Sequence, residues 1–212
     1  MSGEVEAIAA NEAIELLDWK RRVFALYAEA RAASDASVAW NRWRAGRDEL
    51  FRSHPQSPIP DEARASYPGV PYFDYERGLR VLADVEPSPA VMTEVGSSGT
   101  EPIAFQRIAR AHFELEGNPH ELELYWLVGY GGGLFVPFRD ETSGAETYGG
   151  GRYLLDTVKG SDLGMEDGRL VLDFNFAYNP SCSYDPRWVC PLSPPANRLP
   201  DAIRAGERMT PG

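Results

Sequence analysis

The sequence predicts a mainly β protein, an antiparallel β-barrel or sandwich preceded by an N-terminal helical hairpin. Every proline and 18 of the 20 glycines follow His54, so the residues that interrupt helices are confined to the later part of the chain. Short runs that alternate apolar and polar residues then follow one another, as in half-buried strands. No helical pattern of about 10–15 residues separates these runs, which disfavours parallel βαβ units.

We expect one domain over residues 1–212, because a chain of this length can bury a substantial core. The composition divides it into an N-terminal helical hairpin (11–53), a proline-rich connector (54–71) and a β part (72–212) that ends in a proline-rich segment. The connector is expected to lie over the body of the domain.

Two amphipathic helices are predicted, Asn11–Ala33 and Ser37–Ser53. Asp35 can cap the second helix, and His54-Pro55 ends it because the residue before a proline disfavours helical backbone. Arginines flank the tryptophans of the second helix, which allows stacking on bases, but an apolar stripe with solvated flanks explains the spacing better. The apolar positions are Leu16, Trp19, Val23, Leu26 or Tyr27 and Ala30, then Trp40, Trp43, Leu50 and Phe51.

Strands are predicted wherever alternation or a short apolar run appears between turn signals. Gly129–Gly133 is interpreted as a tight turn rather than a phosphate-binding loop, because no helix and no Lys-Ser/Thr pair follows. A short helix is expected from Pro200 to Arg204. The predicted strands are residues 79–86, 91–95, 105–116, 122–128, 134–138, 152–156 and 169–176, with 162–168 as a loop.

Charge and hydropathy exclude several classes of function. The net charge is −11, and −10 of it follows His54, so a basic surface for nucleic acid is not expected. No apolar run is long enough to span a membrane. The opening Met1–Trp19 is acidic and has no basic residue, unlike a secretory signal, so we expect a soluble cytoplasmic protein.

The densest cluster of polar residues is the predicted loop 139–153. Asp140, Glu146, Tyr148 and Arg152 are placed to form a hydrogen-bonded network or to bind a polar ligand, since an arginine offers two parallel donors to a carboxylate or phosphate. The competing interpretation is a structural loop in which the same groups bind one another and the backbone.

A second cluster follows in residues 170–182. Strand alternation would put Asp173 and Asn175 on the face opposite the apolar residues, toward either solvent or a cavity. In a cavity, Asp173 could act as a general base beside an orienting amide. Tyr178 and Asn179 continue this cluster. The apolar set is Leu170, Leu172, Phe174 and Phe176.

Cys182 and Cys190 are the only cysteines. Two cysteines without histidines at metal-motif spacing make a weak zinc site, and a stable disulfide is not expected in a cytoplasmic setting. Buried structural thiols are therefore the favoured interpretation. No metal site and no cofactor is evident from the motifs.

The ordered motifs resemble an uncharacterised prokaryotic family, the domain of unknown function 1684. The resemblance covers nearly all the chain from the first helix onward, with Ser183-Tyr184 where the family usually has Ala-Tyr. It implies no activity, cofactor or catalytic residue. The motifs are Trp43-Arg44, Leu50-Phe51, His54-Pro55, Phe138-Arg139-Asp140-Glu141-Thr142, Glu146-Thr147-Tyr148, Gly151-Arg152-Tyr153, Asp173-Phe174-Asn175, Ala177-Tyr178-Asn179-Pro180, Cys182, Cys190-Pro191, Asn197-Arg198-Leu199-Pro200 and Ala205-Gly206-Glu207.

The leading hypothesis is a pocket that binds a small polar or anionic metabolite and that could transform it by acid-base chemistry. In it Asp173 or Glu146 is the base, Tyr148 a donor, and Arg152 and Arg198 hold an anion. The remaining predicted ligand-binding residues are Asn175, Tyr178, Asn179 and Asp140.

Two alternatives stay open. One is a non-enzymatic interaction module, including a homodimer, in which the tryptophan-bearing helices dock a partner. The other is a split-barrel-like flavin-binding protein, by analogy of fold alone.

Overall fold

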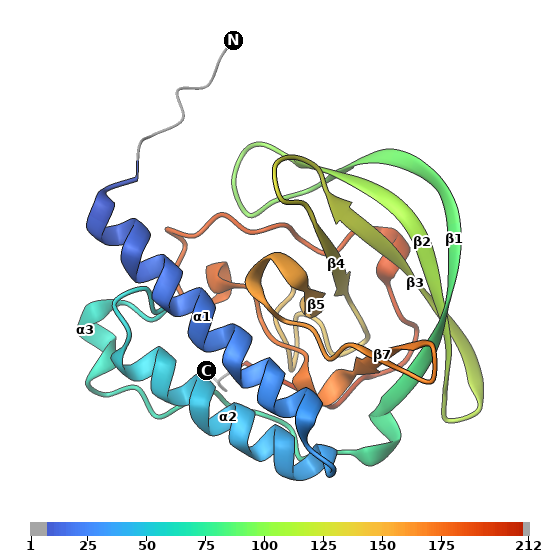
Figure 1. The fold of residues 1–212 in the computed structure, drawn as a ribbon, viewed down its shortest axis with the longest axis horizontal. Coiled ribbons are helices and arrows are strands. Elements are labelled where there is room, and N and C mark those ends of the chain that lie inside the picture. The colour runs from blue at the N-terminus through green and yellow to red at the C-terminus, as the bar shows by residue number, and fades with distance from the viewer. Residues whose placement is uncertain (1–7, 210–212) are drawn as a thin grey trace.

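The computed structural model describes residues 8–209, in which one seven-stranded antiparallel sheet curls into a half-barrel behind a pair of helices (Figure 1). The strand order is β5-β4-β3-β2-β1-β7-β6. This architecture confirms the predicted fold class and is a half-barrel rather than a two-sheet sandwich. The strands are β1 (Arg80–Val95), β2 (Ile103–Leu115), β3 (Asn118–Leu127), β4 (Gly133–Phe138), β5 (Arg152–Asp156), β6 (Met165–Glu166) and β7 (Arg169–Asp173).

The two ends of the sheet approach each other. Tyr153 of β5 pairs with Tyr178, which follows β7, through two backbone hydrogen bonds of 2.9 and 3.1 Å. This bridge partly closes the half-barrel around its apolar core. That core is built from inward-facing side chains of most strands and includes Phe113, Leu122, Val136, Phe138, Leu155, Leu172 and Phe174.

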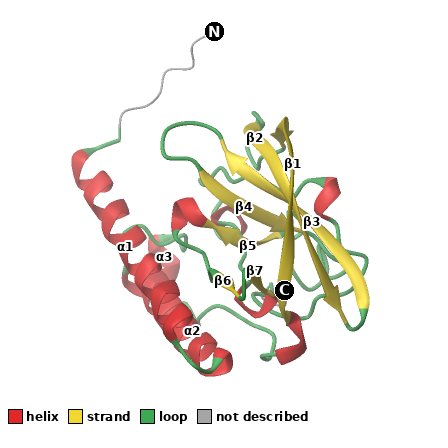
Figure 2. Cartoon of the chain, turned by 45° about the vertical axis from the view of Figure 1, so that its right-hand side comes forward, coloured by secondary structure: helices red, strands yellow, loops and turns green. Residues whose placement is uncertain are grey.

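The predicted helical hairpin is present as α1 (Ala10–Ala32) and α2 (Ala36–Ser53), and it lies against one side of the half-barrel (Figure 2). The Asp35 side chain accepts from two backbone N–H groups and caps α2, as its position predicts. Trp43 packs on Phe176 with ring centroids 4.9 Å apart, which joins the hairpin to the segment after β7. A short helix, α3 (Asp61–Arg64), lies in the connector.

β1 differs from its prediction, because residues 79–86 and 91–95 form one long strand rather than two. A register irregularity between Pro87 and Val91 in its pairing with β2 accommodates the two prolines at 87 and 89. The glycine run after β3 is a hairpin turn, as predicted, and Gly129, Gly131 and Gly132 have positive φ there.

β7 is shorter than predicted and ends at Asp173. Residues 174–176 form the short 3-10 helix η3 (Phe174–Phe176) because the Asp173 side chain caps it, so the predicted alternation stops. Four further 3-10 helices are η1 (Arg77–Leu79), η2 (Thr157–Lys159), η4 (Ser181–Ser183) and η5 (Pro195–Asn197).

The helix predicted from Pro200 to Arg204 is wrong. The chain runs there as an extended strap, residues 198–209, along the loop that follows β4. Its backbone groups are taken by other partners: Leu199 N–H donates to Arg139 over 2.8 Å, and Ile203 N–H donates to Asp140 over 2.8 Å. The Asp201 carbonyl likewise accepts from the Glu141 N–H over 3.2 Å, so the backbone of this segment bonds to distant segments and not within a helical turn.

Within residues 8–209, no helix has the length and apolar character that crossing a membrane requires. The first part of the acidic opening, residues 1–7, lies outside the described residues.

Candidate functional site

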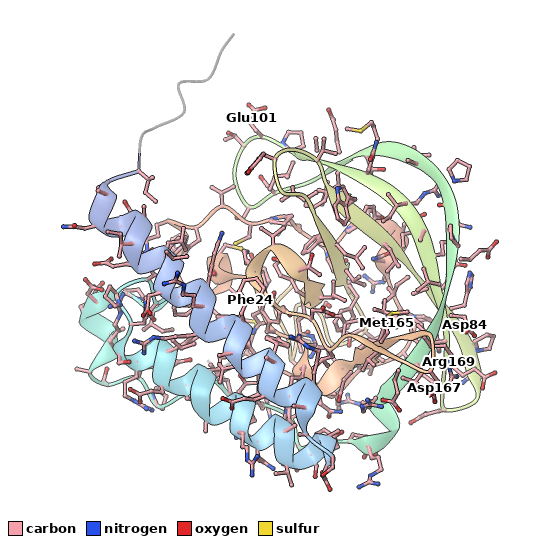
Figure 3. The ribbon with its side chains drawn as sticks, viewed as in Figure 1. Phe24, Asp84, Glu101, Met165, Asp167 and Arg169 are labelled. Atoms are coloured by element: carbon pink, nitrogen blue, oxygen red, sulfur yellow. The ribbon has the colours of Figure 1, made fainter. Side chains whose placement is uncertain are left out.

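A cavity of about 290 Å³ lies between the turn that joins the two helices and the β6–β7 hairpin. We call it the β7 cavity; Ala30, Ala36, Arg80, Glu166, Asp173 and Phe176 are among its lining residues. The β6–β7 hairpin beside it pairs with β1, and Figure 3 labels Met165, Asp167 and Arg169 of this hairpin and Asp84 of β1; of these four, Met165 lines the cavity. The cavity thus combines alanines and Arg31 from the helices with the charged side chains of Arg80, Glu166 and Asp173 from the strands.

Asp173 is the buried polar group of this cavity, with only 2% of its surface exposed. Its Oδ1 accepts from the backbone N–H of Asn175 over 3.0 Å and from Asn175 Nδ2 over 2.8 Å. Its Oδ2 is buried and has no hydrogen-bond partner among the described residues. One carboxylate oxygen therefore fixes the backbone, while the hydrogen-bonding capacity of the other is not used by any described residue.

Asn175 orients Asp173 and is itself held on all sides. Its Nδ2 also donates to the carbonyl of Glu76 over 2.9 Å, and its Oδ1 accepts from the Glu76 N–H over 2.8 Å. The indole of Trp40 donates to the Asn175 carbonyl over 2.7 Å. These contacts occupy the amide, so Asn175 positions the carboxylate rather than offering a free group to a ligand.

The electrostatic setting of Asp173 suits proton exchange. Burial raises the pKa of Asp173 to about 6, although the hydrogen bonds from Asn175 and the charge of Arg80 act in the opposite direction. Arg80 lies on the same cavity wall and pairs with Glu166 over 2.6 Å near solvent. A carboxyl group that titrates near neutral pH in a cavity is a candidate acid or base.

Arg152 and Asp140 lie elsewhere, in a buried ion pair of 3.1 Å. The Arg152 guanidinium also donates to carbonyl oxygens of the strap: those of Ala205, of Ile203 at 2.8 Å and of Glu207 at 3.2 Å. With 1% of its surface exposed, Arg152 has no face open to a ligand. The ligand-binding role of Arg152 and Asp140 stays a prediction, and these contacts favour the structural alternative.

The other residues predicted from the loop and the strap are also dispersed. Glu146 pairs with Arg204 at the surface, and the hydrogen bond from Arg204 lowers the pKa of that carboxyl. Arg198 pairs with Glu141 over 2.9 Å, also at the surface. Across residues 8–209, no hydrogen bond or ion pair links Asp173 to Glu146 or Arg152. The expected convergence of both clusters on one pocket is not seen in these contacts.

Tyr178 and Asn179 line a different, small cavity of about 50 Å³ between the helical hairpin and the segment after β7. The hydroxyl of Tyr178 and Oδ1 of Asn179 are buried there without partners among the described residues. A space of this volume is large enough for a water molecule and too small for most metabolites.

Beside that small cavity lies a fully buried carboxylate, Glu207. It accepts from Arg47 Nε over 2.6 Å, from Tyr184 over 2.7 Å and from the backbone N–H of Asn179 over 2.6 Å. Neither Arg47 nor Glu207 is predicted from the sequence as a functional residue. Arg47 fits the pattern of a solvated flank of a helix, and Glu207 stands in a motif that has no chemical interpretation.

The sequence does not predict the ion pair between Arg80 and Glu166 either. Arg80 is a polar position of the predicted strand 79–86, and Glu166 belongs to the predicted loop 162–168. Nothing in these local patterns shows that the two segments are neighbours. In the part of the chain that the structure describes, no group of three or more His, Cys, Asp or Glu side chains is arranged to hold a metal ion.

Comparison with known proteins gives a classification. The model of a family described as a protein of unknown function (DUF1684) matches residues 65–208. The solution NMR structure of an uncharacterized protein from Haloarcula marismortui is similar, with 37% sequence identity over 78% of this chain and 90% of that chain and a TM-score of 0.55. No curated protein matches the chain. The matched region includes Arg80, Glu166 and Asp173.

Proposed function

The chain belongs to a family of unknown function (DUF1684), and we propose that this protein binds a small polar or anionic metabolite in the β7 cavity and exchanges a proton with it through Asp173. The proposal depends on one observation, the buried Oδ2 of Asp173 that has no partner among the described residues. Leaving such an oxygen unsatisfied costs about 1–3 kcal/mol, and a ligand donor would recover that free energy.

The cavity indicates the class of ligand. Its volume of about 290 Å³ is near the lower end of the range for small-molecule sites, roughly 300–1,000 Å³, and suits a metabolite of a few carbon atoms. Arg80 offers a guanidinium that can hold a carboxylate or phosphate in exchange for Glu166. The alanines and Phe176 on the opposite wall suit a short carbon chain.

The chemistry follows from the two oxygens of Asp173. Asn175 holds Oδ1, so the carboxyl cannot rotate freely, and Oδ2 is the atom that takes up or releases the proton. Above a pH of about 6 the group is ionised and acts as a base toward a ligand hydroxyl or an acidic C–H; below it, the group acts as an acid.

Thermal-shift and NMR titrations with a panel of acetate, lactate, pyruvate, malate and glycerol phosphate test the binding. We expect at least one anion to stabilise the wild-type protein and to shift signals of the α1–α2 turn and of β7. Asp173→Asn keeps the shape of the side chain and an oxygen that accepts from Asn175, but it no longer titrates. The Asp173→Asn variant should bind the stabilising anion more weakly, and Arg80→Gln should no longer bind it.

Glu146→Gln is the matched control, because it removes a carboxylate that pairs at the surface with Arg204, outside the β7 cavity. Equal affinity in the wild type and in the Asp173 and Arg80 variants would contradict the proposal, as would the absence of any stabilising anion. Incorporation of deuterium from heavy water into pyruvate, slowed in Asp173→Asn but not in Glu146→Gln, would support proton exchange through Asp173.

The competing prediction, partner docking through the tryptophan-bearing helices, has less support. Trp40 and Trp43 are 3% and 2% exposed and pack inside this chain, so neither is available to a partner. A homodimer that uses another surface stays a prediction.

A further inference from the structure

Three charged side chains of the β7 cavity stand on one face of the sheet. In the antiparallel pairing of β1 with β7, Arg80 lies directly opposite Asp173, and in the pairing of β6 with β7, Glu166 lies opposite Arg169. Positions 169 and 173 of β7 are on the same face, because side chains alternate along a strand. The strand register therefore brings one guanidinium and two carboxylates to one wall of the cavity.

The charged groups around the cavity are paired unevenly. Arg80 Nη2 lies 2.6 Å from Glu166 Oε2, whereas Asp173 forms no ion pair within residues 8–209 and keeps a buried Oδ2 without a hydrogen-bond partner there. A further guanidinium, that of Arg31, lines the same cavity and donates to the carbonyl of Asp162. Among these four charged side chains of the cavity, only Arg80 and Glu166 pair with each other.

The pair of Arg80 and Glu166 is accessible to a ligand. The two side chains keep 28% and 50% of their surface exposed. They also line a second space of about 360 Å³, which we call the outer groove and which shares Ala33 and Ala36 with the β7 cavity as well. An ion pair this exposed contributes little to stability, so a ligand can replace either partner at small cost.

The charge balance decides what such a ligand carries. An anion that binds Arg80 leaves Glu166 without its partner and adds a negative charge beside two carboxylates. A cation that binds Glu166 leaves Arg80 unpaired in the same way. A zwitterion replaces both partners at once, because its carboxylate binds Arg80 and its ammonium binds Glu166, and the net charge of the cavity does not change.

Asp173 favours an ammonium over a hydroxyl as the donor of the ligand. A hydroxyl has one proton to donate, whereas an ammonium has three. An ammonium can therefore donate to Glu166 and to Asp173 Oδ2 together, and its charge supplies the counter-ion that Asp173 lacks among the described residues. Hydrogen bonds in which both groups are charged are also stronger than those of a neutral hydroxyl.

We propose that the ligand of the β7 cavity is a small zwitterion with the chemistry of a short amino acid, whose carboxylate binds Arg80 and whose ammonium binds Glu166 and Asp173. This inference rests on the proposed function, since it names the class of ligand for the same site. A space of about 290 Å³ suits an amino acid with a short side chain, and a longer side chain has room in the adjoining outer groove.

The donor predicted from the sequence, Tyr148, takes no part in this site. Its hydroxyl lies 3.6 Å from the sulfur of Cys182, which is half-buried, and neither residue lines the β7 cavity or the outer groove. The donor that Asp173 Oδ2 lacks is therefore assigned to the ligand.

Titration with four compounds on the same three-carbon frame tests the charge requirement. L-Alanine carries both charges, L-lactate has a hydroxyl in place of the ammonium, propionate has neither donor, and L-alaninamide has no carboxylate. Calorimetry and NMR give the Kd of each for the wild-type protein. We expect L-alanine to bind about tenfold more tightly than L-lactate, because its donor is charged, and more tightly than the other two. It should shift signals of the α1–α2 turn, β6 and β7.

Glu166→Gln isolates the contribution of the ammonium, because it removes a carboxylate that binds the ammonium and frees Arg80 for an anion. The preference for L-alanine over L-lactate should fall about three- to fivefold in this variant, while L-lactate itself should bind no more weakly than before. Glu141→Gln is the matched control: its carboxylate is 52% exposed and pairs with Arg198 over 2.9 Å, outside both spaces, so the preference should not change. Thermal unfolding of each variant confirms that it is folded.

The possible failures are distinguishable. L-Lactate binding as tightly as L-alanine would overturn the zwitterion and leave the proposed function standing. A preference for L-alanine that is unchanged in Glu166→Gln would overturn the role of Glu166 and with it the inference. L-Alaninamide binding as tightly as L-alanine would show that no carboxylate is required, against both proposals. If neither L-alanine nor any of the anions binds, the proposed function fails as well.

Discussion

Arg47 Nε lies 2.6 Å from Glu207 Oε1, and the carboxylate is fully buried. Arg47 belongs to α2 and Glu207 to the strap, so this ion pair fastens the helical hairpin to the end of the β part. Tyr184 and the backbone N–H of Asn179 donate to the second oxygen of the same carboxylate. The hydrogen bonds compensate for the desolvation of the charge, which is the condition under which a buried ion pair is tolerated.

Glu207→Gln should destabilise the fold by about 3–5 kcal/mol, because it removes one charge and leaves the Arg47 guanidinium buried without a counter-ion. Urea denaturation followed by circular dichroism measures the free energy of unfolding. Arg198→Gln is the control: it breaks an exposed pair with Glu141, and its expected cost is below about 1 kcal/mol. Equal effects of the two substitutions would contradict the assigned role of Glu207.

Arg152→Met should cost a similar amount, about 3–5 kcal/mol, since it leaves Asp140 unpaired and frees three carbonyl oxygens of the strap. The double variant with Asp140→Asn should cost less than the sum of the two single ones, because the pair acts as a unit. Glu146→Gln, by comparison, should leave the free energy of unfolding nearly unchanged, because its ion pair with Arg204 is exposed to solvent. Weakened ligand binding by a stably folded Arg152→Met would instead restore the sequence-based role of this arginine.

Sequence patterns predicted the elements of this fold well where the signal is local. The bounds of both helices agree with the structure to within one residue, and the strands β2 to β5 lie close to their predicted ranges. One error has a local cause, because the Asp173 side chain caps η3 and ends β7 early. The other has a long-range cause, because side chains distant in the sequence bind the backbone of Ile203 in the segment after Pro200.

The site was harder to predict, because it depends on which segments are neighbours. Asp173 was singled out by type and position, and the structure places it in a cavity. Two charged residues that line the same cavity, Arg80 and Glu166, are distant from each other in the chain and belong to no motif. Arg152 shows the converse: its residue type suggests a ligand, but only the path of the strap reveals that backbone carbonyls and Asp140 accept from both terminal nitrogens of the guanidinium.

Gly206→Ala should be among the most damaging small substitutions in the strap. Gly206 has φ of +75°, and a Cβ there would lie 2.7 Å from the carbonyl oxygen of Phe174. Strain and overlap together should cost about 2–4 kcal/mol in urea denaturation. Gly117→Ala is the matched control, with φ of +81° and open space around the new methyl, and only about 1 kcal/mol is expected. A cost at Gly206 no larger than at Gly117 would show that the strap moves aside easily.

The pH dependence of stability should carry the signature of Asp173. Its pKa is about 6 in the folded protein, above the ordinary value of 3.8, so the folded state binds this proton more tightly than the unfolded state does. The resulting stabilisation is complete below pH 3.8 and is lost as the pH rises through about 6. Asp173→Asn does not titrate, so its stability relative to the wild type should increase by about 2–3 kcal/mol between pH 4 and pH 7.

The comparison of the two proteins at each pH isolates this group, because the other carboxylates contribute equally to both. Urea denaturation at intervals from pH 4 to pH 7.5 gives the difference in the free energy of unfolding, and the chemical shift of the Asp173 carboxyl carbon reports its pKa directly. A constant difference across this range, with a shift midpoint near pH 4, would mean that Oδ2 is well solvated. In that case the acid-base role proposed for the β7 cavity would lose its physical basis, since an Asp with an ordinary pKa is a weak base at neutral pH.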